Sequence, residues 1–244
     1  VKLYQPDAST TVGVFAPWAF WKKDFQDIGG HDPIFAPQSK EDTDIFNRFQ
    51  LNEIEFIQTW EGFVYHMTCR GSRFADGAKR NPNGEVFMKN RETEEWLKQN
   101  QKSTREFLRK WGHFCKHDEF LKPIIPPKYD IGFIVKNCND DFLSALEPWC
   151  STIYVDGSRT KYISLEQPNT SFNLSERILP YDNEKNNEIL VEIDCNNITN
   201  QDMQLLQQLP EILKDSGEIG EFELGNLHIR VAQLKTYEKE LIQC

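Results

Sequence analysis

Residues 28–49 read IGGHDPIFAPQSKEDTDIFNRF and contain the most informative pattern in the chain. The glycine pair Gly29 and Gly30 is followed closely by Asp32, and a proline-bounded loop then leads to Glu41 and Asp42. Apolar residues recur after these acids at helical spacing, which predicts a helix of at least two turns that begins at the acids. The dipole of such a helix favours ionised carboxylates in its first turn.

The acids at the start of this helix have two interpretations. An ionised carboxylate fixed at a loop–helix junction is suited to general-base catalysis, because the position of a base matters before its pKa does. Alternatively, Ser39 or Asp42 caps the helix, and the remaining acids stabilise its dipole. The residues alone leave both interpretations open.

Several motifs in a fixed order resemble the acceptor-side half of a family 2-like glycosyltransferase of the GT-A fold: GGHDPIF, EDTDIFNRF, Trp60 and VYHMTCRGSRF. The resemblance covers roughly the first half of the chain. It implies that Asp42 deprotonates the acceptor hydroxyl with Glu41 beside it. The segment from Gly29 and Gly30 to Asp32 would border the sugar site. His31 and Pro33 depart from the family pattern, which leaves the donor preference open.

The same resemblance extends to the residues around VYHMTCRGSRF. It implies that His66 is a ligand of a divalent ion, manganese or magnesium, which neutralises the diphosphate leaving group. Trp60 and the loop residues Arg70, Ser72 and Arg73 would bind substrate, the loop residues through phosphate oxygens. The implied partners are a nucleotide-sugar donor and a glycan or other hydroxyl acceptor. A structural histidine and a solvated basic loop are the alternative interpretation.

Composition and charge limit the class of protein. The chain has 244 residues, of which 39% are hydrophobic and 12% aromatic, so it is long enough for one large or two ordinary domains. Up to Lys122 there are 18 basic and 18 acidic residues, and 10 basic and 20 acidic residues follow. An acidic second half does not favour nucleic acid as a partner. No apolar run is long enough for a transmembrane segment, and six scattered cysteines favour reduced thiols in a cytoplasmic protein.

The segment KPIIPPK, at residues 122–128, is the strongest boundary signal. It predicts an acceptor-side half at 1–122, a proline-rich linker at 123–128 and an acidic α+β domain of unknown role at 129–244. Residues 91–116 before it are predicted as one bent helix or two, whose basic residues are solvated: Arg105, Arg109 and Lys110.

The order of predicted elements after the linker is βαβ–βαβ, which suggests a ferredoxin-like α+β sandwich. Pro210 is expected to bend or break the helix around it, and a hairpin is expected to turn at Gly225 and Asn226. Asp194, at the end of an apolar strand, is the best catalytic candidate in this half, although aspartates there mostly form turns.

The overall class is therefore α+β, with a partial GT-A-like α/β half first. Only 28 residues precede the glycine pair, too few for a nucleotide-binding half, so we expect a fragment of a transferase that is inactive alone. The missing half would leave an apolar edge near residues 12–21 and favour self-association. The rival hypothesis is a non-catalytic interaction protein with a degenerate transferase scaffold and an acidic partner-binding domain.

Overall fold

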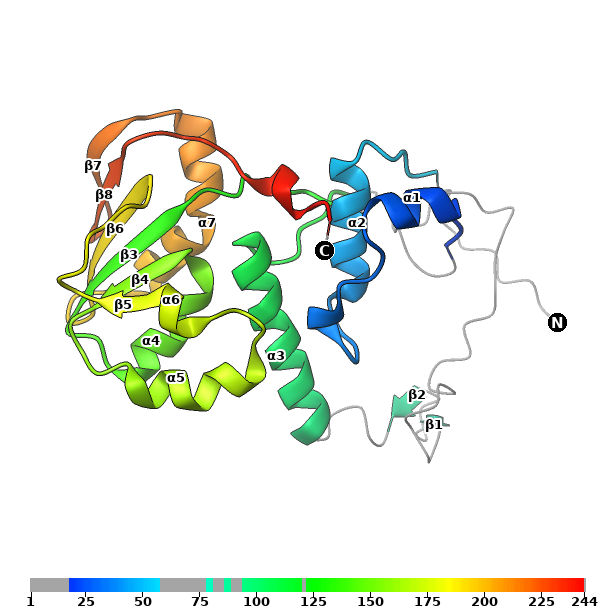
Figure 1. The fold of residues 1–244 in the computed structure, drawn as a ribbon, viewed down its shortest axis with the longest axis horizontal. Helices are drawn as coiled ribbons and strands as arrows, with labels where there is room; N and C mark the ends of the chain where they lie inside the picture. The colour runs from blue at the N-terminus through cyan, green and yellow to red at the C-terminus, as the bar shows by residue number, and fades with distance from the viewer. Residues whose placement is uncertain (1–17, 58–77, 81–85, 89–93, 120–121, 244) are drawn as a thin grey trace.

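The fold is that of a computed structural model that describes residues 18–57, 78–80, 86–88, 94–119 and 122–243 (Figure 1). The described residues of the first part of the chain are mainly helical, and β1 and β2 form a small antiparallel pair. Its elements are α1 (Lys22–Asp27), η1 (Pro33–Phe35), α2 (Glu41–Leu51), β1 (Ala78–Arg80), β2 (Val86–Met88) and α3 (Glu94–Trp111). The predicted helix after the glycine pair is thus confirmed as α2.

The second part contains a six-stranded mixed sheet in the order β5-β4-β3-β6-β8-β7. The four strands β5, β4, β3 and β6 are parallel to one another, and β8 pairs antiparallel with both β6 and β7. The strands are β3 (Ile131–Lys136), β4 (Thr152–Val155), β5 (Ile178–Pro180), β6 (Ile189–Asp194), β7 (Gly220–Leu224) and β8 (Leu227–Val231). The helices between and after them are α4 (Asp140–Leu146), η2 (Glu147–Trp149), α5 (Thr160–Glu166), η3 (Gln167–Asn169), α6 (Leu174–Arg177), α7 (Asn200–Ser216) and η4 (Glu238–Leu241).

This strand order corrects the ferredoxin-like arrangement predicted from the sequence, although helices and a mixed sheet agree with the broader α+β class. The order of elements along the chain does not say which strands are neighbours. The polar stretch 168–187, which the pattern left without an element, also contains α6 and β5. A fourth parallel strand, β5, therefore extends the sheet beyond β4.

The main hydrophobic cluster lies between the sheet and its helices, which Figure 1 shows on one side of the sheet. Phe133 and Val191 project from the sheet into this cluster, and Leu143 of α4 and Leu209 of α7 meet them. Pro210 is buried within α7, which continues to Ser216, so the expectation of a broken helix is wrong.

The opposite face of the sheet is covered near β3 and β4 by the connection from β5 to β6. Asn187 in that connection accepts a hydrogen bond from the hydroxyl of Tyr154 at 2.9 Å. A Cβ atom at Gly132 would lie 2.4 Å from Oδ1 of Asn187, so only glycine lets the connection lie this close to β3.

Helix α3 contacts both parts of the chain. Its Leu108 belongs to the main cluster of the sheet, whereas Phe107 and Trp111 pack with Phe35 of η1. The C-terminal segment also returns to the first part, where Ile242 packs against the cluster around α2. The predicted boundary at 123–128 stays a prediction, and residues on its two sides are in contact.

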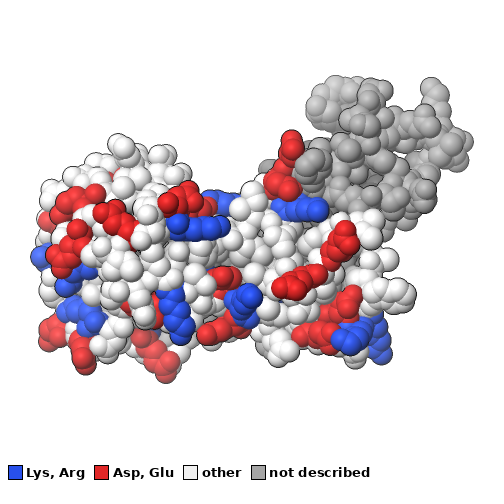
Figure 2. Space-filling model, turned by 90° about the horizontal axis from the view of Figure 1, so that it is seen from above, with Lys and Arg blue, Asp and Glu red and all other residues white. Residues whose placement is uncertain are grey.

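Charged side chains of both signs are interspersed on the face seen in Figure 2. The acidic excess of the second half therefore does not appear there as one continuous acidic surface.

Candidate functional site

Helix α2 begins without a side-chain cap. Its N-cap is Lys40, in the left-handed conformation with φ 73°, and no side chain accepts a hydrogen bond there. Ser39 instead donates from Oγ to Oδ1 of Asn100 at 2.7 Å. Capping by Ser39 or Asp42 is therefore wrong as an explanation of this sequence. Asp42, the second residue of the helix, has an exposed side chain.

The third acid of the stretch, Asp44, has a different role, because its side chain is fully buried. Its Oδ2 accepts from Nε of Arg48 at 2.8 Å, and its Oδ1 accepts from the indole of Trp111 at 2.9 Å and lies 2.7 Å from Nζ of Lys110. Asp44 therefore holds α2 against α3. Sequence reasoning assigned roles to Asp42 and Glu41 and did not foresee that Asp44 is committed to the fold.

Arg48 joins α2 to the glycine loop. Its guanidinium is buried and donates to the carbonyl oxygens of Ile28 and Gly30, both at 2.6 Å. Gly29 and Gly30 have φ values of 80° and 81°, a region that L side chains rarely adopt. The two glycines thus permit the turn that presents both carbonyls to one guanidinium.

Asp32 is held next to the same helix. Its Oδ1 accepts from the backbone N–H of Ile34 at 3.0 Å, and its Oδ2 is 2.7 Å from Nζ of Lys110. Lys110 thus bridges Asp32 and Asp44. Since Asp32 is only partly exposed and already paired, it orients the loop more directly than it offers a free carboxylate.

Glu41, the first residue of α2, has one carboxylate oxygen that the fold does not use. Its Oε2 is buried and has no hydrogen-bond partner among the residues that the structure describes. A buried oxygen of this kind is able to accept a hydrogen bond from a bound group. Glu41 and Asp42 therefore present one shielded and one exposed carboxylate at the same helix terminus.

The remaining predicted site residues lie outside the described residues: Trp60, His66, Arg70, Ser72 and Arg73. Within the described ranges, the structure has no group of three or more histidine, cysteine, aspartate or glutamate side chains that is able to hold a metal ion. The proposed metal ligand and phosphate contacts thus stay predictions.

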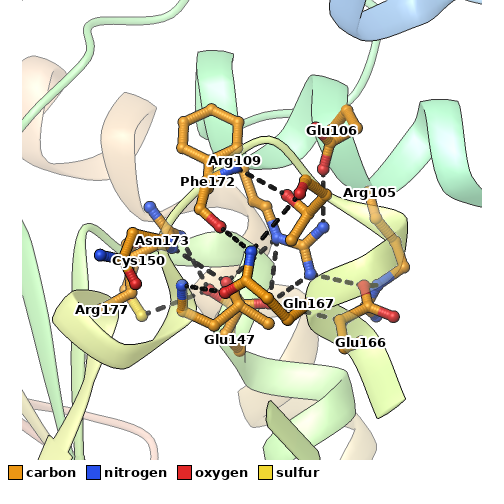
Figure 3. A network of polar contacts seen from close by, with 12 residues as sticks. Arg105, Glu106, Arg109, Glu147, Cys150, Glu166, Gln167, Phe172, Asn173 and Arg177 are labelled. Carbon is orange, nitrogen blue, oxygen red and sulfur yellow. Dashed lines mark hydrogen bonds and ion pairs between the residues drawn. The ribbon is translucent and has the colours of Figure 1, made fainter. Parts of the chain in front are cut away.

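A buried ionic network, which sequence reasoning missed, anchors α3 to the second part of the chain (Figure 3). Arg109 donates to Glu147 through Nε at 3.1 Å and through a terminal nitrogen at 2.7 Å, and it also pairs with Glu106 and Glu166. Arg177 donates to Glu147 from the far side at 3.0 Å. Although burial opposes ionisation, hydrogen bonds and charge attraction from Arg109 lower the pKa of Glu147 to about 2.

This network corrects the prediction of a solvated basic face on α3. Arg109 and Lys110 are buried, and Arg105 is nearly so, because their acidic partners come from other elements. The partner Glu147 lies 38 residues away from Arg109 along the chain. Local sequence carries no signal for such a pair.

Comparisons of the chain with protein-family models, with curated proteins and with solved structures found no match. No helix among the described residues is both long enough and apolar enough to cross a membrane.

Asp194, the candidate from the second half, lies at the carboxyl end of β6. It accepts from Nδ2 of Asn137 at 2.7 Å and from the N–H of Asn196 at 3.0 Å, and these bonds lower its pKa. Asp156, after β4, accepts from the N–H groups of Asn137 and Cys138 at 2.7 and 3.2 Å. Both aspartates therefore hold the loops at this edge of the sheet, in keeping with the turn-forming alternative.

Proposed function

We propose that the chain carries the acceptor side of a nucleotide-sugar-dependent inverting glycosyltransferase, with Asp42 as the general base. The observation that carries the proposal is the link through Arg48. It fixes the glycine loop to the helix whose first turn holds the exposed Asp42. The motif thus forms one local unit, and the carboxylate of Asp42 remains available for catalysis.

The contrast between two acids of α2 supports this assignment. Asp44 is buried and paired with Arg48, so its charge is used to hold the helix. Asp42 is exposed and does not cap the helix, so its side chain is not committed to the fold as that of Asp44 is. Its place in the first helical turn favours the ionised form that a base requires.

In the proposed reaction, the carboxylate of Asp42 takes the proton of the acceptor hydroxyl. The hydroxyl oxygen attacks the anomeric carbon of the donor as the bond to the diphosphate breaks, which inverts that carbon. Glu41 would orient the acceptor through its shielded oxygen, and Gly29, Gly30 and Asp32 would border the sugar. A divalent ion, manganese or magnesium, would neutralise the departing diphosphate when bound, with His66 among its ligands.

The donor half of the site is part of the same proposal. We infer that residues beyond this chain hold the nucleotide, because catalysis of this kind depends on positioning donor and acceptor together. The chain alone would then not turn over a nucleotide sugar. Self-association near residues 12–21 stays part of this proposal, and within the described residues Trp21 there is 80% exposed.

The test is nucleotide release by the complete product of the gene that encodes this chain, with manganese and a panel of nucleotide sugars. Asp42→Asn should lower turnover by about 10²–10⁴-fold, the usual contribution of a general base, and leave the unfolding midpoint unchanged. Asp27→Asn, at an exposed acid of α1, is the matched control and should keep full activity. Full transfer by Asp42→Asn would refute the role of Asp42. The absence of release with every donor would favour the non-catalytic interaction protein.

A further inference from the structure

Two cysteines follow neighbouring strands at the carboxyl edge of the sheet. Cys138 comes two residues after the end of β3, and Cys195 directly follows β6. The strands are adjacent and parallel, with Lys136 opposite Asp194. The N–H of Cys195 also donates to the carbonyl of Lys136 at 3.0 Å, so the two loops leave the sheet side by side.

The side chains of the two cysteines share one environment. Cys195 is 5% exposed and belongs to the main hydrophobic cluster, and the partly exposed Cys138 packs against the same cluster. Asp156 binds the N–H of Cys138, and Asn137 binds the side chain of Asp194. These bonds hold both loops at the same edge of the sheet, so the two cysteines stay in neighbouring positions.

The thiols also interact directly. Their mutual hydrogen bond lowers the pKa of Cys195 and raises the pKa of Cys138, so the proton is lost first from Cys195. The carboxylates of Asp156 and Asp194 oppose ionisation of Cys195 but do not cancel this effect. Since the thiolate is the reactive form of cysteine, a pair in which one thiol ionises more readily favours oxidation of one sulfur and its capture by the other.

The other described cysteines differ. Burial raises the pKa of Cys150 to about 12, and burial also raises the pKa of Cys115. Neither Cys115 nor Cys150 follows the end of a strand, so neither lies beside a second cysteine in the way that Cys138 and Cys195 do. Cys150 therefore provides a matched control within the same hydrophobic cluster.

We propose that Cys138 and Cys195 are a reversible redox pair that a hydroperoxide oxidises to a disulfide. The sulfur of one of the two cysteines attacks one peroxide oxygen, the O–O bond breaks, and an alcohol or water leaves, which gives a sulfenic acid on that cysteine. The sulfur of the other cysteine then attacks the sulfenic sulfur; the S–S bond forms, and the hydroxyl leaves with the proton of the attacking thiol as water. The two thiols lose two hydrogen atoms and the hydroperoxide is reduced. A dithiol reverses the reaction by exchange.

This inference goes beyond the proposed transferase and does not depend on it. The disulfide would tie the loop after β3 to the loop after β6 and close the intervening chain into a covalent loop. Closing a long loop restricts the unfolded chain, so the oxidised form should be harder to unfold.

The experiment treats the purified chain with hydrogen peroxide, blocks the remaining thiols, and maps disulfides by mass spectrometry without reduction. We expect a peptide pair that joins Cys138 to Cys195 and disappears after treatment with dithiothreitol. The midpoint of urea unfolding should rise on oxidation and return on reduction. With Cys138→Ser, a sulfenic-acid probe should label Cys195, and the rise should vanish. Cys150→Ser should behave as the unchanged chain.

Three results would overturn the proposal. One is peroxide treatment that leaves both thiols free, and another is a dominant disulfide of either residue with a different cysteine. The third is labelling of Cys150 before Cys195. Disulfide mapping of the unchanged chain decides the question even where a serine variant does not fold.

Discussion

The guanidinium of Arg48 donates to the carbonyl oxygen of Gly30 at 2.6 Å. This bond joins a loop built on positive φ values to the helix that carries the candidate base. Because the same guanidinium also pairs with the buried Asp44, the loop, the helix and their charge pair form one interdependent unit. Changes at Arg48 should therefore affect the fold and the proposed site together.

Replacing Arg48 with leucine should strongly destabilise the chain. The change removes the guanidinium that pairs with Asp44 and donates to the carbonyls of Ile28 and Gly30, a loss of about 3–5 kcal/mol for a broken buried pair. Urea unfolding followed by circular dichroism measures it. Lys23→Ala removes an exposed pair on α1 and should have little effect. Equal midpoints for the two variants would show that the network of Arg48 adds nothing.

The ionic network should make stability depend on pH in acid. The pKa of Glu147 is about 2 in the folded chain, below its ordinary 4.5, so its contribution is present above pH 4.5 and is lost as pH falls toward 2. That depression corresponds to about 3 kcal/mol. The free energy of unfolding should decrease by this amount as the pH is lowered across this range. Glu147→Gln should be less stable at neutral pH and should lack this part of the pH dependence.

His113 should produce a separate pH dependence at higher pH. It is buried, and desolvation, helped by Lys128 and Lys116, lowers its pKa from 6.5 to about 4. Below pH 6.5 the unfolded chain binds a proton at this residue and the folded chain does not. Stability should therefore fall by about 3 kcal/mol between pH 6.5 and 4 and then level off. His113→Phe should remove this fall, whereas the same change at the exposed His117 should not.

Gly217, which ends α7, and Gly225, in the turn of the β7–β8 hairpin, form a matched pair of glycines. Gly217 and Gly225 have nearly equal φ values, 62° and 63°, but a Cβ atom meets nothing within 4 Å at Gly217 and lies 2.4 Å from Oδ1 of Asp202 at Gly225. Alanine at Gly217 should cost only the backbone strain, about 1–2 kcal/mol. At Gly225 it should also displace Asp202, which completes the capping box of α7 with Thr199. We expect at least about 1 kcal/mol more at Gly225, from the loss of that cap. Thermal unfolding of the two variants provides the comparison, and equal losses would contradict the clash.

Residue pattern alone predicted several elements correctly. The helix after the acids, the strands of IGFIVK and ILVEID, and the helix that ends at Gly217 are all present. The hairpin turns at Gly225 and Asn226 as expected. These features depend on local spacing, on caps and on glycine, which a short window of sequence contains.

Other expectations were wrong because a competing contact lay far away. Pro210 does not end α7, because Leu209 and Leu213 keep the helix packed on the sheet. The segment LKTYEKELI, whose residues predict a last helix, contains only the short η4. The residues before α4 favour Asp140 or Asp141 as its cap, but Asn139 is the cap in the structure.

The sequence by itself determined where helices and strands form and which stretch holds the candidate base. Only the tertiary structure decided the role of each acid in that stretch, because Asp44 is committed to the fold by partners on α3 whereas Asp42 remains exposed. It also decided that the basic residues of α3 are buried and that β5 lies beside β4. The physical reason is that the conformational preferences of neighbouring residues are enough to favour a helix or a strand and to place its ends to within a few residues. Ion pairing and strand neighbours instead depend on groups that only the folded chain brings together.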